Sequence, residues 1–267
     1  MENKTCRLDG KLSAFRIFAR LDVKNLNVVK GIQLDGLRSV GDPIELARKY
    51  LEAGVDELVL VDVVASLYNR KNLSSLITEI ADELRIPLTG LGGVKNLSDA
   101  RSVFNSGADK VALNSAGLES PGLFMEISEL YGSQSVVCSV EAKKINKVSL
   151  WNCMTENGRN DSGTEITEWI PNLESLGVGE VFVTSVDRDG TSRGPDLELC
   201  ERIRNLTEIP VIYSGGIRDA EDIYQVADIG IDGVAIGAAL HYGKLSIRES
   251  KEILFSKGIF VRTLEGI

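Results

Sequence analysis

Two stretches of the chain decide its fold: IPLTGLGGVKNLSDARSVFNSGADKVALNSA, which begins at Ile86, and IPVIYSGGIRDAEDIYQVADIGIDGVAIGAA, which begins at Ile209. They align without a gap at an offset of 123 residues, and eleven of the thirty-one aligned positions are identical. The same offset relates Gly54 to Gly177, so the register continues into the preceding segment. Self-similarity over this length predicts two equivalent halves related by a pseudo-twofold axis.

Short β-rich apolar runs alternate with amphipathic stretches along the chain, which is typical of βαβ units and a parallel sheet. The expected strands are Arg16–Asp22, Glu57–Val63, Ile86–Leu91, Lys110–Asn114, Ser135–Glu141, Glu180–Ser185, Pro210–Ser214 and Gly233–Gly237. The expected helices are Pro43–Ala53, Leu73–Leu84, Ser98–Ser106, Gly122–Tyr131, Glu165–Leu176, Leu197–Asn205, Ala220–Asp228 and Ile247–Ser256.

Strict alternation of this kind predicts an α/β fold, a (βα)₈ TIM barrel formed from two duplicated half-barrels. We expect residues 1–267 to form one barrel domain, with half-barrels at about 16–134 and 135–257. A doubly wound sheet is the alternative, and the internal repeat disfavours it.

Composition narrows the class of protein. A net charge of −9 disfavours a general role at nucleic acids or membrane surfaces. No run of about 18 residues is apolar enough to span a membrane, and the N-terminal MENKTCRLDG lacks the apolar stretch of a secretory signal. We therefore expect a cytoplasmic protein. The cysteines form no CxxC pair, so no metal site and no disulfide framework is expected from Cys6, Cys138, Cys153 and Cys200.

A Gly-Gly turn follows a strand in each copy of the repeat. Glycine lets the backbone approach a ligand closely, and the following N–H groups can point at phosphate oxygens. The next strand in each half ends in a small-residue turn, and barrels commonly bind phosphate at the loops after strands seven and eight. The sequence therefore predicts two opposed phosphate sites, although a tight turn alone could explain either pair. They comprise Gly92, Gly93, Asn114, Ser115 and Ala116 in one half and Gly215, Gly216, Gly237, Ala238 and Ala239 in the other.

Two carboxylates stand at strand ends, where active groups of this fold lie. Asp22 ends the first strand in RIFARLD, and Glu141 ends the fifth strand in SVVCSVE, across the barrel. Carboxylates that face one substrate can perform general acid–base chemistry if their surroundings separate their pKa values. An N-cap or a loop ion pair is the alternative role for each.

Further polar residues are expected at the same rim. The sixth strand ends in TSVDRDGTSRG, where hydroxyl and carboxylate groups could contact the substrate, or where the segment is only a solvated turn. The candidates are Thr184, Asp187, Asp189, Gly190 and Thr191. The connection from Val23 to Gly41 is long for a βα loop, and we expect a lid that holds a phosphate with Lys30. His241, the only histidine, has no partner motif, so a packing or surface role is expected.

These residues lie in strings that resemble the cyclase subunit family of imidazole glycerol phosphate synthase (HisF). The strings are LDVKN followed by VVKG, GDPIELARKY, DELVLVDVVAS, ADKVALNSA, YGSQSVV and VTSVDRDGTSRG, and the resemblance runs from about Arg16 to Arg262. It implies a half-barrel duplication and no cofactor. It also implies an enzyme, a carbon–nitrogen lyase that combines ammonia with a bisphosphorylated ribulosyl aminoimidazole intermediate. The implied products are imidazole glycerol phosphate and an aminoimidazole carboxamide ribotide (AICAR), and the implied catalytic residues are Asp22 and Glu141.

The resemblance also implies a partner. Family members receive ammonia from a glutaminase subunit (HisH-like) in a heterodimer, through a ring of charged residues at the opposite end of the barrel. Arg16, Glu57, Lys110 and Glu180 match that ring. Each stands at the start of an expected strand, so inward charges of alternating sign would pair there, and a merely stabilising ring is the alternative.

The sequence departs from the family pattern at two places. The family has Asp where this chain has Glu141, and its first strand usually reads IIPCLD where this chain has RIFARLD. Strings such as VASLYNR and ALHYGKL are closer to divergent paralogues, some of which are thought to amidinate a sugar in surface-glycan biosynthesis. Three alternatives therefore stay open: such a paralogue, a related aminoaldose–ketose isomerase, and a non-catalytic sugar-phosphate-binding barrel. The charged ring disfavours the isomerase, which needs no ammonia.

Overall fold

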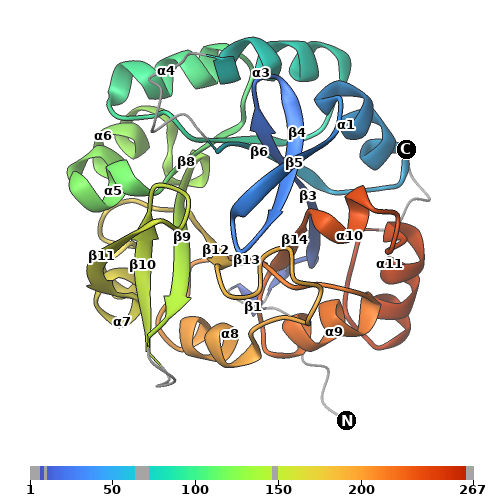
Figure 1. Cartoon of the computed structure of the whole chain (residues 1–267). Coiled ribbons are helices and arrows are strands. Elements are labelled where there is room, and N and C mark those ends of the chain that lie inside the picture. Colours follow the sequence, from blue (N-terminus) through green and yellow to red (C-terminus); the bar gives the residue numbers. More distant parts are fainter. Residues whose placement is uncertain (1–6, 9–10, 64–71, 146–149, 263–267) are drawn as a thin grey trace.

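The chain forms a closed barrel of eight parallel strands, described by a computed structural model that covers residues 7–8, 11–63, 72–145 and 150–262. The barrel strands are β3 (Arg16–Lys24), β6 (Glu57–Asp62), β7 (Leu88–Leu91), β8 (Lys110–Leu113), β9 (Val136–Lys144), β12 (Glu180–Ser185), β13 (Val211–Ser214) and β14 (Gly233–Ile236). They pair in chain order, and β8 and β9 join the halves while β14 pairs with β3 to close the ring. The view of Figure 1 runs along the barrel. The predicted (βα)₈ fold is confirmed.

Helices surround the barrel on its outer face (Figure 1). They are α1 (Pro43–Glu52), α3 (Asn72–Glu83), α4 (Leu97–Asn105), α5 (Ser115–Glu119), α6 (Gly122–Tyr131), α7 (Ile166–Trp169), α8 (Leu197–Arg204), α9 (Ala220–Asp228), α10 (Ala238–His241) and α11 (Ile247–Ser256), with 3₁₀ turns η1 (Ser133–Ser135) and η2 (Ile170–Asn172). Several begin where the sequence supplies a cap: the Asp42 carboxylate accepts hydrogen bonds from the first turn of α1, and Ser246 does so for α11.

Alternation along the strands divides the core into two layers. In β3 the side chains of Ile17, Ala19 and Leu21 pack outward against the helices, whereas Phe18 lies in the barrel interior with Phe182 of β12. Period-two alternation produces this division because successive side chains of a strand point to opposite faces. Arg20 and Asp22 share the inward face with Phe18.

The duplication extends to the backbone. The φ angles of Gly92 and Gly93 are 114° and 75°, and those of Gly215 and Gly216 are 126° and 79°. Asn114 and Gly237, which follow in equivalent turns, adopt φ −114°, ψ −94° and φ −110°, ψ −82°. The positive φ values of the two Gly-Gly pairs favour glycine, so the turn itself requires glycine at these positions. The half-barrel boundaries remain a prediction.

Two hairpins extend the barrel at opposite strands. The segment from Val23 to Gly41 is not an irregular loop, as the sequence predicted, but the antiparallel hairpin β4 (Asn27–Ile32) and β5 (Asp35–Gly41), which continues β3. The strands β10 (Trp151–Thr155) and β11 (Asn160–Glu165) form the second hairpin, on β9. The predicted helix at 165–176 is reduced in the structure to α7 and η2, which follow β11 directly. Figure 1 shows β4 and β5 crossing the barrel opening.

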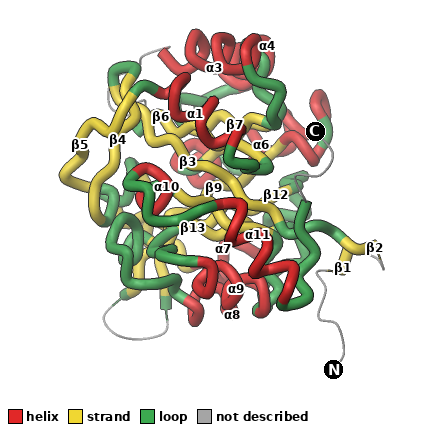
Figure 2. Tube along the Cα trace, turned by 90° about the vertical axis from the view of Figure 1, so that its right-hand side faces the viewer, coloured by secondary structure: helices red, strands yellow, loops and turns green. Residues whose placement is uncertain are grey.

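The N-terminal side carries a small separate hairpin, β1 (Arg7–Leu8) and β2 (Lys11–Leu12). Figure 2 shows it at the side of the molecule away from β4 and β5. Among the described residues, none of the helices has the length and apolar character needed to cross a membrane. Cys138, Cys153 and Cys200 are buried free thiols, and Cys6 lies outside the described residues.

Candidate active site

Asp22 lies at the centre of a buried charged network at the carboxyl end of the barrel. Its Oδ2 accepts a hydrogen bond from Lys30 Nζ at 2.8 Å, and its Oδ1 accepts one from Arg20 Nε at 2.7 Å. Lys30 reaches down from the β4 hairpin and also donates to both carboxylate oxygens of Asp189 at 2.9 Å. The hairpin and the loop after β12 therefore meet over Asp22.

Arg20 is a site residue that the sequence reasoning missed. It is 2% exposed, and its Nη1 donates to Thr184 Oγ1 at 2.9 Å and lies 3.4 Å from Ser214 Oγ. The guanidinium also lies 5.9 Å from the centre of the Phe182 ring. Because side chains alternate along a strand, Arg20 could have been predicted to face inward with Phe18 and Asp22. Its contacts with Thr184 and Ser214 could not, because these residues belong to strands far away in the sequence.

Opposing effects set the ionisation of Asp22. Burial alone would raise the pKa of its carboxyl, but the neighbouring Arg20 and Lys30 cations and their hydrogen bonds outweigh burial and hold that pKa well below its usual range. Asp22 is therefore an ionised carboxylate at neutral pH.

Glu141 has the opposite surroundings. Burial raises its pKa from the ordinary 4.5 to about 7, against smaller lowering effects of the Gly158 N–H, Arg20 and Asn114. Its Oε2 accepts a hydrogen bond from Gly158 N at 2.7 Å. Gly158 lies in the β10–β11 turn, after Asn157, and the Asn-Gly pair is the sequence signal that would have predicted this hairpin. The two carboxyl groups thus differ in protonation near pH 7.

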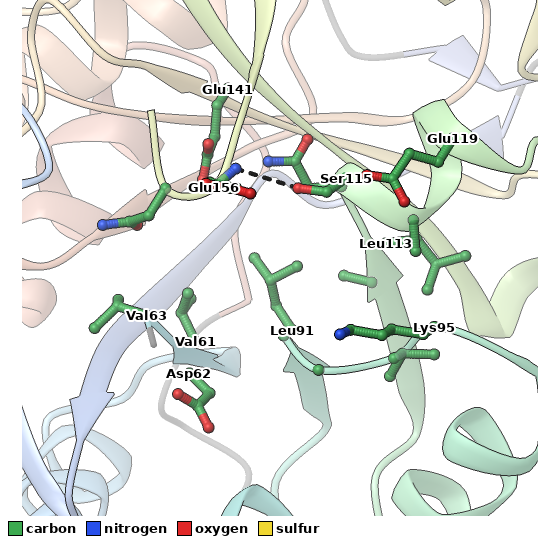
Figure 3. A pocket seen from close by; sticks show the side chains of 17 residues that line it. Val61, Asp62, Val63, Leu91, Lys95, Leu113, Ser115, Glu119, Glu141 and Glu156 are labelled. Atoms are coloured by element: carbon green, nitrogen blue, oxygen red, sulfur yellow. Dashed lines mark hydrogen bonds between the residues drawn. The ribbon is translucent and has the colours of Figure 1, made fainter. Parts of the chain in front are cut away.

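The first glycine turn borders an open cavity. This cavity has a volume of about 230 Å³ and is lined by Gly92, Gly93, Asn114, Ser115 and Glu141 among others. Figure 3 shows Lys95 and Glu119 on its side away from Glu141, and the hydrogen bond from Glu156 N to Ser115 Oγ. Within the described chain, Asn114 Oδ1 is a buried acceptor that has no hydrogen-bond partner.

The second glycine turn is largely covered. Its cavity measures only about 20 Å³ and is lined by Gly215, Gly216, Gly237 and Ala238 together with Lys30, Asp189 and Gly190. Gln33 of the β4–β5 hairpin donates its backbone N–H to Asp189 O at 2.8 Å. A Cβ atom on Gly190 would lie 2.1 Å from Gly31 O, so this close approach requires glycine. The hairpin therefore lies directly over the second turn.

Three other residues predicted at the rim, Thr184, Asp187 and Thr191, make contacts within the protein. Thr184 is buried beneath Arg20, and Thr191 donates its hydroxyl to Arg188 O at 2.7 Å. The Asp187 carboxylate accepts a hydrogen bond from Lys144 N at 2.8 Å, which ties the loop to β9. None of these three residues lines either of the two cavities described above.

His241 lies in α10, near the second turn. Its Nδ1 is 2.7 Å from Tyr50 Oη. Burial and the Lys30 cation lower the pKa of the imidazole to about 4, so the ring is neutral at physiological pH.

A ring of four charges closes the other end of the barrel. Arg16 contacts Glu57 and Glu180, each at 2.7 Å, and Lys110 Nζ lies 2.8 Å from Glu57 and 3.1 Å from Glu180. Each carboxylate thus bridges the two cations. Arg16 and Lys110 also lie 5.1 Å and 5.8 Å from the centre of the Phe18 ring, the first interior residue beyond them. The alternating arrangement expected from the sequence is present.

Comparison with known proteins identifies the family. A family model described as "Histidine biosynthesis protein" matches residues 16–246. The imidazole glycerol phosphate synthase subunit HisF of Thermococcus onnurineus is 43% identical over 249 residues, which cover 93% of this chain and 98% of that protein. HisF of Pyrococcus furiosus is 41% identical over the same shares. HisF of Legionella pneumophila is 44% identical over 211 residues, which cover 79% of this chain and 99% of that protein. The chain therefore belongs to the HisF family of histidine biosynthesis proteins.

Proposed function

We propose that this chain is the cyclase subunit of an imidazole glycerol phosphate synthase. It uses ammonia to convert a bisphosphorylated ribulosyl aminoimidazole intermediate to imidazole glycerol phosphate and AICAR, as a cytoplasmic carbon–nitrogen lyase of histidine biosynthesis. The observation that carries the proposal is the pair of unlike carboxyl groups, Asp22 and Glu141, on opposite barrel strands between two equivalent glycine turns.

The substrate's two phosphates would bind at the two turns. The first turn borders the cavity that Glu141 also lines, and its unpartnered Asn114 Oδ1 is available to a donor of the substrate. The second turn lies under the hairpin with Lys30, whose ammonium can contact a phosphate if the hairpin moves. A substrate with a phosphate at each end would then span the barrel opening with its reacting atoms between the carboxyl groups.

The proposal is tested with the purified chain, the bisphosphorylated intermediate and excess ammonium salt at alkaline pH, with substrate consumption followed by absorbance. Turnover to both products is expected. If the intermediate is not consumed while a nucleotide-sugar acceptor gains nitrogen, the chain is the sugar-directed paralogue. Binding of the intermediate without turnover on either acceptor would identify a binding barrel.

A glutaminase subunit would supply ammonia at the charged ring. The relatives named above are subunits of a synthase, and the ring lies at the end of the barrel away from the site. Interior side chains between them, Phe18 and Val59 among others, are mostly apolar. Neutral ammonia can cross such an interior more readily than ammonium, because a buried charge is costly.

Weakening the charged ring should affect turnover with ammonium salt and turnover with a glutaminase subunit differently. Glu57→Gln removes one of the two carboxylates that bridge Arg16 and Lys110. Turnover with ammonium salt should persist, whereas with a glutaminase subunit of the same synthase family the glutamate formed per product should rise, because ammonia escapes. The measurement compares glutamate with product, and the exposed Glu45→Gln in α1 is the control. An unchanged ratio would assign the ring a stabilising role only.

The departure at position 141 can be tested directly. Glu141→Asp shortens the side chain by one methylene, so its carboxylate cannot keep the 2.7 Å contact with Gly158 N in place. A displacement of about 1 Å can cost on the order of 10²-fold in rate, and we expect kcat to fall by about that factor. A large gain in kcat would instead mean that the site is better suited to the shorter family residue.

A further inference from the structure

Arg20 has no counterpart in the other half of the barrel. The offset that relates Asp22 to Glu141 relates Arg20 to Ser139, which is also buried. A hydroxyl cannot neutralise a carboxylate, so the second half supplies no cation from this position.

The contacts of Arg20 fix one orientation of Asp22. Nε donates to Asp22 Oδ1, and Nη1 is held by Thr184 and Ser214 from two other strands. Since the guanidinium is planar and its donors are rigid, anchoring one nitrogen sets the direction of the others. Lys30 holds the second oxygen of Asp22 from above. Both carboxylate oxygens are therefore engaged by cations from different elements.

We propose that Arg20 is a positioning residue that, together with Lys30, keeps Asp22 an oriented anion throughout turnover and leaves Glu141 to take up and release protons. This inference rests on the proposed function and deepens it. Asp22 then stabilises positive charge that develops on substrate nitrogen, while Glu141 exchanges protons with substrate atoms. Two carboxyl groups with opposite surroundings commonly divide these roles.

Several charged or titratable groups of the described residues surround Asp22. Arg20 from β3 and Lys30 from β4 favour its anion. Asp189, from the loop after β12, is paired with Lys30. Glu141 on β9 faces the site with burial favouring its neutral form. His241 of α10 has a lowered pKa and adds no cation near pH 7. Lys30 is shared between Asp22 and Asp189. Removal of Arg20 should therefore raise the Asp22 pKa more directly than removal of Lys30 would.

The test is a ¹³C-carboxyl NMR titration of the full chain without substrate, with Asp22→Asn and Glu141→Gln used to assign the two signals. In the wild type we expect Glu141 to titrate near pH 7 and Asp22 to stay ionised through the acidic range in which the protein is folded. In Arg20→Cys the Asp22 pKa should rise by about 1–3, the usual effect of a neighbouring opposite charge. Arg20→Lys, which keeps the charge, should restore most of the wild-type behaviour.

Arg48→Cys is the matched control, because it removes an arginine from an exposed ion pair with Glu83. It should leave both carboxyl signals unchanged. In the activity assay with free ammonia held constant, Arg20→Cys should add a second decline of kcat, below the range in which Glu141 titrates, that the wild type lacks, and Arg20→Lys should remove that decline. A merely structural role for Arg20 would not move a pH profile in this way.

Titration of wild-type Asp22 at an ordinary carboxyl pKa would overturn the proposal without any variant. An Asp22 signal in folded Arg20→Cys that matches the wild type would overturn it too. The titrations need no substrate, so they stand even if the chain fails to turn over the bisphosphorylated intermediate. That failure would refute the proposed function alone.

Discussion

Asp22→Asn should lower kcat of the ammonia-dependent reaction by about 10²–10⁴-fold, the range for a charged group that acts directly on the reacting atoms. The amide keeps the shape of the carboxylate but not its charge. Arg20 and Lys30 then face each other without the anion between them. The variant therefore loses both the charge that stabilises developing cations and the contact that orients Lys30.

The same variant should also be less stable. Removing one partner of a buried ion pair commonly costs about 3–5 kcal/mol, and the retained contacts of Lys30 with Asp189 and of Arg20 with Thr184 place the expected loss near the lower end. Urea unfolding measures this loss, and kcat is compared under conditions where both proteins are folded.

Asp42→Asn is a fair control for both measurements. Asp42 is exposed and caps α1, and Asn serves equally well at an N-cap. Its kcat and unfolding free energy should match the wild type. If folded Asp22→Asn kept kcat within a few-fold of the wild type, Asp22 could not belong to the catalytic pair.

Much of the architecture could be predicted because the repeat carries it. Strand Glu180–Ser185 and helices Gly122–Tyr131, Ala220–Asp228 and Ile247–Ser256 have their predicted bounds, and the other barrel strands differ only at their ends. In each βα unit of a duplicated barrel, the spacing of hydrophobic residues and the position of the turn glycines agree with the overall fold. Local sequence patterns are therefore sufficient to predict most strands and helices.

The two hairpins escaped prediction for a physical reason. Each continues a barrel strand beyond the barrel, and its residues do not alternate cleanly between apolar and polar. The turn at Gln33 and Leu34 has φ of 53° and 63° without any glycine, so the usual hairpin signal is missing there. At Asn157-Gly158 the signal is present, but the following β11 strand NDSGTE is polar throughout.

The contacts of the site were also beyond sequence reasoning. The pattern placed Asp22 and Glu141 at opposite strand ends, but it could not reveal that one would meet two cations and the other a backbone N–H. Lys30 is 8 residues from Asp22, and Gly158 is 17 residues from Glu141. Arg20 is only two residues from Asp22, but it is held in place by Thr184 and Ser214, which are 164 and 194 residues away from it, so tertiary packing completes the site. Equivalent positions in two halves therefore have different chemistry.

Glu141→Gln should stabilise the protein at alkaline pH while it lowers kcat. The folded protein holds the Glu141 proton up to about pH 7, whereas the unfolded chain releases it near 4.5. Between these values the folded state binds more protons, so the wild type loses stability as pH rises. A difference of this size corresponds to about 3 kcal/mol. Gln carries no charge to desolvate, so the variant avoids this loss.

Urea unfolding at pH 4.5 and pH 8 checks the sign. Near pH 4.5 Glu141 is protonated in the folded state and about half protonated in the unfolded chain, so little of the stability loss has developed and the variant and the wild type should differ little. At pH 8 the variant should be more stable. The exposed Glu83→Gln, which removes only a surface pair with Arg48, should shift stability by less than about 1 kcal/mol. With free ammonia held constant, kcat of Glu141→Gln should be reduced and should lack the pH dependence near 7. Equal stability at pH 8 would mean that folding does not raise the Glu141 pKa, and Glu141 would then lose its role as the proton-carrying group of the pair.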